Sequence, residues 1–184
     1  MGFSGVFSDF PTIETERLLL REITDYDAED FFSIWADQGV QEGLDTRGFS
    51  SIEGARKHLR VKSNAFKQKK NLTWGIVKRG SMAIVGACFY RAFEQRSKAE
   101  LSYYLASPYW RQGIMTEALD VIVSFGFAAM ELHRIQAYVQ PDNLAAIRVI
   151  EKTGFRREGV LRKYHYSKEK GWVDKALYAR LADA

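Results

Sequence analysis

The amphipathic segment at residues 114–129 constrains the fold of this 184-residue chain more than any other feature. Its apolar residues recur at intervals of three and four: Met115, Ala118, Leu119, Ile122, Phe125, Gly126 and Ala129. That period places them on one face of an α-helix, whereas Glu117, Asp120 and Ser124 lie off that face. The preceding alternating stretch stops near Pro108, which has no backbone donor for a strand ladder. A strand therefore leads directly into this helix.

The remaining segments alternate between strand and helix patterns. Two capping boxes, Thr24 with Asp27 and Ser50 with Glu53, predict helices that run to about residue 37 and about residue 69. Alternating or apolar runs between turn-forming residues predict strands. These strands lie at residues 16–23, 72–78, 82–93, 99–105, 134–139, 160–166 and 172–181.

The order of these elements predicts the fold class. A last helix follows Asn143 and ends before Gly154, which suits the left-handed position that terminates a helix. The order is strand, two helices, three strands, helix, strand, helix and two strands. We therefore predict an α/β (α+β) fold, with a mixed, mostly antiparallel twisted sheet of six to seven strands and helices on both faces. Residues 1–184 are expected to form a single domain, with a core at about 14–181 and an N-terminal extension at 1–13.

Composition narrows the class of protein. Hydrophobic residues make up 46% and charged residues 27% of the chain, as in a soluble globular protein. The longest apolar stretch, 121–130, is shorter than the roughly 18 residues that a membrane span needs, and the first residues lack the pattern of a signal peptide. Cys88 is the only cysteine, which excludes an internal disulfide and favours a cytoplasmic location with a buried thiol. The net charge of +4 is compatible with an acidic ligand, such as a phosphorylated cofactor, or with nucleic acid.

Residues 109–116 join the strand to the long helix and have the chemistry of an anion site. The first turn of a helix leaves about four backbone N–H groups unpaired, and the helix dipole makes that end electropositive. Gly113 permits a close approach to the backbone, while Arg111 adds positive charge and Thr116 a hydroxyl. The segment thus favours a phosphate or pyrophosphate ligand. The alternative is a tight turn that needs Gly113 only for its backbone angles.

The segment Trp110–Met115 resembles the pyrophosphate loop of the GNAT acetyltransferases. Further motifs, in the same order along the chain, resemble the Rim-type branch that acetylates the N-termini of ribosomal proteins. These are Thr15–Arg21, Glu100–Leu105, Tyr109–Gly113, Asn143, Glu151–Phe155, Glu158–Arg162 and Asp174 with Tyr178. The ordered set spans about residues 14–181 and is more specific than any single motif. The resemblance implies a GNAT fold, acetyl-CoA as cosubstrate, and direct acetyl transfer to a primary amine, above all the N-terminal amine of a ribosomal or other protein.

The same resemblance assigns the residues that hold the cofactor. Backbone amides near Tyr104 and Leu105 are expected to contact the pantetheine and the oxyanion. Asn143 is expected to hydrogen-bond the pantetheine arm or the incoming amine, although it also suits a helix N-cap, and the two roles are compatible. Met115 replaces a small residue of the family motif and is expected to crowd the cofactor slightly. The cofactor residues are Leu105, Arg111, Gln112, Gly113, Ile114, Met115, Thr116 and Asn143.

Glu100 is the candidate general base, and with Tyr104 and Asn143 it completes the expected catalytic set. A carboxylate in an otherwise apolar strand implies either a raised pKa or a structural ion pair. Tyr104 or Tyr103 is a candidate proton donor to the departing thiolate, with packing as the alternative. Ala146 stands where the branch often has a serine in that role. Two late tyrosines, Tyr164 and Tyr166, resemble residues that line the acceptor pocket, with ordinary packing as the alternative.

Further expectations concern metals, the acceptor, nucleic acid and the oligomeric state. The three histidines have no ligand spacing, so no metal is expected. A small amine of the polyamine or aminoglycoside type is the alternative acceptor, and a non-catalytic CoA-binding module is the alternative to an enzyme. Basic groups at residues 67–70, 156–157 and 162–163 favour solvated faces over a nucleic-acid site. Whether the chain is a monomer or a homodimer stays open.

Overall fold

The computed structural model describes residues 5–44, 47–94 and 97–182, and its centre is one sheet. Every neighbouring pair of strands is antiparallel except β5 and β6, which are parallel. In spatial order the sheet contains β1 (Ile13–Glu14), β2 (Leu18–Glu22), β3 (Asn71–Lys78), β4 (Ile84–Glu94), β5 (Lys98–Leu105), β6 (Arg134–Val139), β8 (Gly171–Leu181) and β7 (Arg156–Ser167).

The predicted fold class is confirmed, but the predicted strand number is too low. The described residues form eight strands instead of six or seven. The additional strand, β1, contains only two residues, and a strand this short has no alternating pattern for the sequence to reveal.

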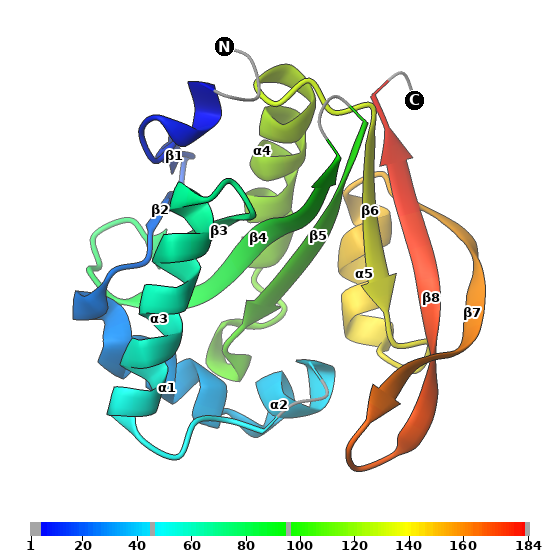
Figure 1. Cartoon of the computed structure of the whole chain (residues 1–184), viewed down its shortest axis with the longest axis horizontal. Coiled ribbons are helices and arrows are strands. Elements are labelled where there is room, and N and C mark those ends of the chain that lie inside the picture. Colours follow the sequence, from blue (N-terminus) through cyan, green and yellow to red (C-terminus); the bar gives the residue numbers. More distant parts are fainter. Residues whose placement is uncertain (1–4, 45–46, 95–96, 183–184) are drawn as a thin grey trace.

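Helices cover both faces of the sheet, as Figure 1 shows. α1 (Ala28–Ala36) and α3 (Ile52–Lys67) lie on the near face of that view, and α4 (Ile114–Ala128) and α5 (Leu144–Lys152) lie on the far face. α2 (Gln38–Leu44) follows α1 directly. Two hydrophobic clusters result, one built around α4 and the other around α1 and α3. We call these the α4 face and the α1–α3 face of the sheet.

Local capping chemistry sets most helix ends. The capping box of Thr24 and Asp27 is present and leads through a 3-10 turn into α1. α3 begins one residue later than predicted, because the hydroxyl of Ser51, not Ser50, accepts the N–H of Gly54. Two adjacent serines offer the same cap chemistry, so the sequence alone does not distinguish them. Gly154 has φ of +82°, as expected of a residue that terminates α5.

The segment before β2 packs onto the core. Val6 and Phe7 are buried, and the Phe7 ring lies 5.4 Å from the ring of Phe66. The indole N–H of Trp74 donates to the carbonyl of Pro11 at 2.6 Å. The described part of the expected N-terminal extension is therefore folded against the sheet, while the domain boundaries themselves stay a prediction. Cys88 is buried as expected.

The parallel junction between β5 and β6 is short. Only Lys98, Ala99 and Glu100 pair with β6, whereas β5 pairs with β4 as far as Leu105. Beyond Glu100 the two strands diverge, and α5 lies behind β6 on the far face (Figure 1). We call this divergence the β5–β6 split. Within the described ranges, no helix has the length and apolar character needed to cross a membrane.

Candidate active site

The loop before α4 has the backbone geometry of a ligand cradle. Gly113 is the N-cap residue of α4 and supplies no side chain to cap the first-turn N–H groups. Its φ is +76°, and the φ of Arg111 is +59°, so two residues of this loop have left-handed backbones. A Cβ atom built on Gly113 would meet only the Arg17 guanidinium, at 3.4 Å. Apart from this guanidinium, the space beside Gly113 is therefore open.

Neighbouring side chains fix this loop to the end of β5. The indole N–H of Trp110 donates to the carbonyl of Leu105 at 2.6 Å, and the side-chain amide of Gln112 donates to the carbonyl of Pro108 at 2.9 Å. The carboxylate of Asp37 accepts the backbone N–H and the hydroxyl of Ser107, at 2.9 and 2.6 Å. Asp37 and Trp110 thus support the predicted site, although no sequence motif marks Asp37.

The loop residues fit the pyrophosphate of acetyl-CoA by their donors and their space. Arg111, Gln112 and Gly113 are exposed, and Thr116 is partly exposed. Ile114 and Met115 are buried and turn their side chains into the α4-face core, so only their backbones are available to a ligand. The Met115 side chain therefore lies away from the exposed surface where we expected it to crowd the cofactor. The individual cofactor contacts stay predictions.

Tyr103 and Asn143 both hydrogen-bond the backbone of Ala146 beside the β5–β6 split. The Tyr103 hydroxyl donates to the carbonyl of Ala146 at 2.9 Å, which joins β5 to the first turn of α5. The Asn143 side-chain oxygen accepts the N–H of Ala146 at 3.0 Å, so Asn143 is the N-cap of α5. The Asn143 amide nitrogen is not used by the cap, and it faces Gly43 of α2. The cap role is thus present, and the amide NH₂ remains for the expected cofactor contact.

Tyr104 occupies the opposite face from Tyr103. Its side chain belongs to the α1–α3 cluster, where its ring lies 5.6 Å from that of Trp35. The hydroxyl is buried and has no hydrogen-bond partner among the described residues. Burial raises the pKa of Tyr104, and burial likewise raises that of Tyr103. Both phenols therefore stay protonated at neutral pH, as a proton donor must.

Glu100 lies at the vertex of the split and carries a partner. Its carboxylate accepts from the guanidinium of Arg91 in β4, with Nε at 2.9 Å, and its side chain is 14% exposed. The ion-pair alternative is therefore realised, and the role of Glu100 as general base stays a prediction. Burial, then the hydroxyl of Tyr164, and to a smaller extent the charge of Glu100 raise the pKa of Tyr138 to about 12.

A polar row on β6 continues from Glu100 along the α1–α3 face. Arg134 donates to the amide oxygen of Gln136 at 3.1 Å, and the Gln136 amide donates to the Tyr138 hydroxyl at 3.1 Å. The Tyr138 ring stacks on Tyr164 of β7, with centroids 5.0 Å apart.

Tyr166 instead contacts Trp172, and both of these rings are exposed. Of the two tyrosines expected at the acceptor pocket, the structure brings Tyr164 to this row.

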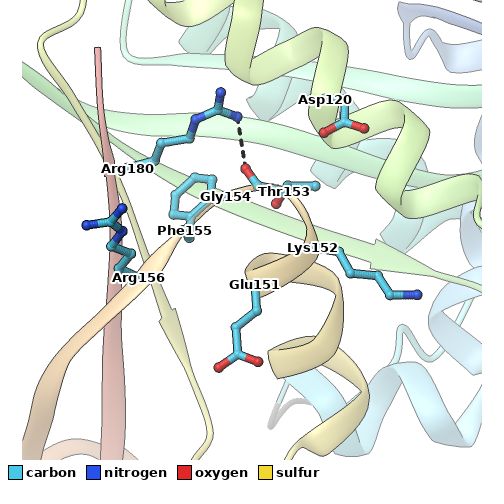
Figure 2. Close-up of a pocket in the computed structure, with 8 residues that line it drawn as sticks. All are labelled: Asp120, Glu151, Lys152, Thr153, Gly154, Phe155, Arg156 and Arg180. Atoms are coloured by element: carbon cyan, nitrogen blue, oxygen red, sulfur yellow. Dashed lines mark hydrogen bonds between the residues drawn. The ribbon is translucent and has the colours of Figure 1, made fainter. Parts of the chain in front are cut away.

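A separate hollow of about 570 Å³ lies at the far end of α5 (Figure 2). There Arg180 of β8 donates to the carbonyl of Thr153 at 2.9 Å. α5 runs for nine residues, so this hollow is about 13 Å along the helix from Asn143 and the split. Its lining residues are Asp120, Glu151, Lys152, Thr153, Gly154, Phe155, Arg156 and Arg180.

Histidine, cysteine and carboxylate side chains do not gather at the site. Within the described part of the chain, no group of three such residues could hold a metal ion. His58 stacks on Phe31 in the α1–α3 core, with ring centroids 5.8 Å apart. Burial, followed by the nearby charge of Lys62, lowers the pKa of His58.

A family model, a related sequence and two solved structures all indicate an acetyltransferase. A family model described as the acetyltransferase (GNAT) domain matches residues 17–156. The chain is 37% identical over 158 residues to the uncharacterised N-acetyltransferase YoaA of Bacillus subtilis, covering 85% of this chain and 89% of YoaA. Its structure is similar to that of a GNAT-family acetyltransferase from Bacillus anthracis, with a TM-score of 0.83, 29% identity, and coverage of 95% and 100%. It is also similar to the ribosomal-protein-S5-alanine acetyltransferase from Vibrio fischeri, with a TM-score of 0.82, 26% identity, and coverage of 94% and 97%.

Proposed function

The chain belongs to the GNAT acetyltransferase family and is an acetyl-CoA-dependent N-acetyltransferase, and on that premise we propose that its acceptor is the N-terminal amine of a protein or peptide. The observation that carries the proposal is the polar row beside the split. Glu100, Gln136 and Tyr138 are partly buried on a strand face that the helices of Figure 1 leave uncovered at β6 and β8. An extended chain end can lie along such a face.

One of the similar structures supports this class of acceptor. The Vibrio fischeri protein is described as acting on the alanine of a ribosomal protein, and it shares 26% of its residues with this chain. Glu158 of β7 and Arg134 of β6 pair at the rim of the same face, at 2.8 Å, so polar groups for a peptide backbone are available there.

In the proposed reaction acetyl-CoA supplies an activated acetyl thioester. The N–H groups at the start of α4 bind its pyrophosphate, and backbone amides near Tyr104 and Leu105 hydrogen-bond the pantetheine and the developing oxyanion. Glu100 removes a proton from the ammonium of the acceptor, directly or through water. A buried tyrosine hydroxyl, Tyr103 or Tyr104, protonates the leaving thiolate. Asn143 orients the amine or the pantetheine through its free NH₂ group.

An acceptor panel tests the proposal. Short peptides with free N-terminal Ala, Ser or Met would be compared with the same peptides blocked by acetylation, with spermidine and with an aminoglycoside. CoA thiol release gives the rate, and mass spectrometry locates the acetyl group. We expect the free peptides to show kcat/KM values at least about tenfold above the small amines, which corresponds to about 1.4 kcal/mol. Turnover of a polyamine or aminoglycoside without turnover of any peptide would reject the acceptor assignment.

The cofactor loop has its own test in Gly113→Asp. The substitution puts bulk and negative charge where the pyrophosphate is expected, so we predict at least about tenfold weaker acetyl-CoA binding by calorimetric titration. Gly113→Asn is the matched control, because asparagine tolerates a left-handed backbone and carries no charge. If both variants fold and bind acetyl-CoA as the wild type does, this loop is only a turn.

A cytoplasmic location is part of the same proposal. It rests on the single cysteine, Cys88, which is buried as a free thiol. Proteins of reducing compartments typically keep such thiols unpaired.

A further inference from the structure

The opening motif Thr15–Arg21 packs onto the first turn of α4, about one hundred residues later in the chain. Glu117 lies in that turn. Its Oε1 atom accepts the Thr15 hydroxyl at 2.5 Å and the backbone N–H of Arg17 at 3.2 Å. Its Oε2 atom accepts Nε of Arg17 at 2.6 Å. The carboxylate is thus held by one side chain and by both the backbone and the side chain of a second residue.

The same guanidinium reaches the loop before α4. Nη1 of Arg17 donates to the carbonyl of Gln112 at 3.1 Å. Nη2 lies 3.4 Å from the position that a Cβ atom of Gly113 would occupy. Arg17 therefore contacts both ends of the short segment whose N–H groups are expected to bind the pyrophosphate.

The charges of Glu117 and Arg17 connect these contacts to the binding of an anionic ligand. Burial alone would raise the pKa of Glu117, but hydrogen bonds from Thr15 and Arg17 outweigh burial and hold the pKa below its usual value. Glu117 is therefore ionised at neutral pH. A carboxylate in the first turn of a helix competes with an anionic ligand for the same positive end. The Arg17 guanidinium, with its side chain 51% exposed, supplies the compensating charge at that place.

Backbone conformation gives a second reason for a clamp. Arg111 has φ of +59°, a left-handed conformation that is unfavourable for a residue with a side chain, and Gly113 has φ of +76°. Such a conformation persists only where the surroundings hold it. The hydrogen bond from Arg17 to the carbonyl of Gln112 holds the peptide between Gln112 and Gly113, next to both left-handed residues.

We propose that Arg17 is a positioning residue for the cofactor. It fixes the carbonyl of Gln112 and compensates the charge of Glu117. The N–H groups of residues 113–116 can then bind the pyrophosphate without repulsion from Glu117. The proposal rests on the cofactor role proposed for the loop. It predicts that Arg17 affects the affinity for the pyrophosphate-bearing ligand, and that this effect depends on the charge of Glu117.

Calorimetric titration of four proteins tests this: the wild type, Arg17→Ala, Arg17→Ala with Glu117→Gln, and Arg79→Ala as matched control. Arg79 donates to the carbonyl of Thr15 at 2.8 Å and pairs with Glu14, and among the described residues its side chain makes no hydrogen bond or ion pair with the loop or α4. The ligands are acetyl-CoA and S-acetylpantetheine, which lacks the pyrophosphate. Melting temperatures of the ligand-free proteins report the stability of each variant.

We expect Arg17→Ala to raise the Kd for acetyl-CoA about tenfold, because it leaves Glu117 uncompensated beside the anion. Adding Glu117→Gln should restore part of that affinity, by about threefold, since the repulsion disappears while the loop stays unclamped. Arg79→Ala should bind both ligands as the wild type does. The affinity for S-acetylpantetheine should change less than twofold in every variant, because no pyrophosphate is present.

Three outcomes would overturn the inference. Arg17→Ala could bind acetyl-CoA as the wild type does, the double variant could bind no better than Arg17→Ala, or both ligands could weaken equally. The last two would make Arg17 a purely structural clamp. If Arg17→Ala does not fold, Arg17→Lys takes its place, because lysine keeps the charge near Glu117 but cannot bridge to Gln112. We expect Arg17→Lys to bind acetyl-CoA about threefold more weakly than the wild type. Wild-type affinity in this variant would contradict the inference. Failure of the wild type itself to bind acetyl-CoA would instead reject the proposed cofactor site.

Discussion

Glu100 is held by Arg91 at the point where β5 and β6 separate, and its partly exposed carboxylate faces the polar row of β6. An ion-paired carboxylate can still accept a proton from an ammonium group if the acceptor displaces or shares the guanidinium. The ion pair explains how a charge is tolerated in this strand. It does not separate a structural from a catalytic role, so a kinetic test is needed.

We predict that Glu100→Gln lowers kcat roughly tenfold to a hundredfold at neutral pH and leaves the acetyl-CoA affinity nearly intact. Glutamine keeps the shape and a hydrogen bond to Arg91 but cannot take the proton. The deficit should shrink as pH rises and the acceptor amine becomes free. Glu14→Gln is the control, because Glu14 is also paired with an arginine, Arg79, but lies on β1 at the edge of the sheet. Equal rates for Glu100→Gln and the wild type at every pH would make Glu100 structural.

Lys62 is a second residue whose environment is informative. Its ammonium lies 4.4 Å from the centre of the Phe89 ring, between α3 and β4. Burial, and then the charge of Arg91, lowers the pKa of Lys62 to about 8, against an ordinary value of 10.5. Below pH 8 the amine is charged in both folded and unfolded chains, so folding carries the full cost of burying that charge. Between pH 8 and 10.5 the folded amine loses its proton first, and the cost declines.

Lys62→Met should therefore be more stable than the wild type at pH 7, by on the order of 2–3 kcal/mol at most. The difference should close as pH rises from about 8 to about 10.5, because the wild type gains stability in that window and the variant does not. Denaturant titrations at several pH values measure the two free energies of unfolding. A difference that is independent of pH would show that the Lys62 amine keeps its ordinary pKa.

α5 is the element whose start closes the β5–β6 split. Asn143 caps its first turn, and Tyr103 binds the carbonyl of Ala146 in that turn. The two expected roles of Asn143 use different atoms, because the cap needs the side-chain oxygen and the pantetheine contact needs the NH₂ group. Substitutions can therefore separate a role in the helix from a role in binding.

Asn143→Asp and Asn143→Ser keep a capping oxygen, so we expect melting temperatures close to that of the wild type. Asn143→Ala should lose about 1 kcal/mol of stability. All three lack the NH₂ donor, and we expect each to weaken acetyl-CoA binding or to lower kcat by about fivefold to tenfold. Thermal melts and calorimetric titrations provide the two readouts. Wild-type binding and turnover in the serine variant would leave Asn143 as a cap alone.

At the scale of the whole molecule, the sheet consists of two antiparallel halves joined by a short parallel junction. Three residue pairs connect β5 to β6, and the Tyr103–Ala146 bond lies beyond them. The Gln140 amide also contacts the carbonyls of Glu42 and Gly43 in α2, at 3.3 and 3.4 Å. A ligand that bridges the split and the start of α4 adds contacts where the described chain has few of its own.

Acetyl-CoA should therefore stabilise the protein against heat. At about 100 times Kd, a ligand that binds only the folded chain adds about 2.7 kcal/mol, which raises the melting temperature of a domain of this size by roughly 5–10 °C. Differential scanning fluorimetry over a range of acetyl-CoA concentrations measures the shift, and Gly113→Asp should reduce it at each concentration. An unchanged melting temperature at saturating acetyl-CoA would contradict the proposed cofactor site.

The sequence by itself determined the features that depend on near neighbours in the chain. The period of α4, the capping box of Thr24 and Asp27, and the terminating Gly154 are each set within a few residues, and all appear where the sequence predicted them. The loop at residues 109–116 belongs to this group, because a glycine before an amphipathic helix fixes its local chemistry. The ordered motifs also predicted the family that the comparisons found.

Only the tertiary structure decided which groups meet. The face of Tyr104, buried under α1, depends on the register of β5, and a shift by one residue would reverse it. The partner of Glu100 comes from β4, and the partners of Glu117 come from the opening motif about one hundred residues earlier. Such contacts follow from how strands pair and how α4 packs on the sheet, and no local pattern records them. The sequence therefore predicted the loop that we propose for the cofactor, while packing supplied the groups that hold this loop in place.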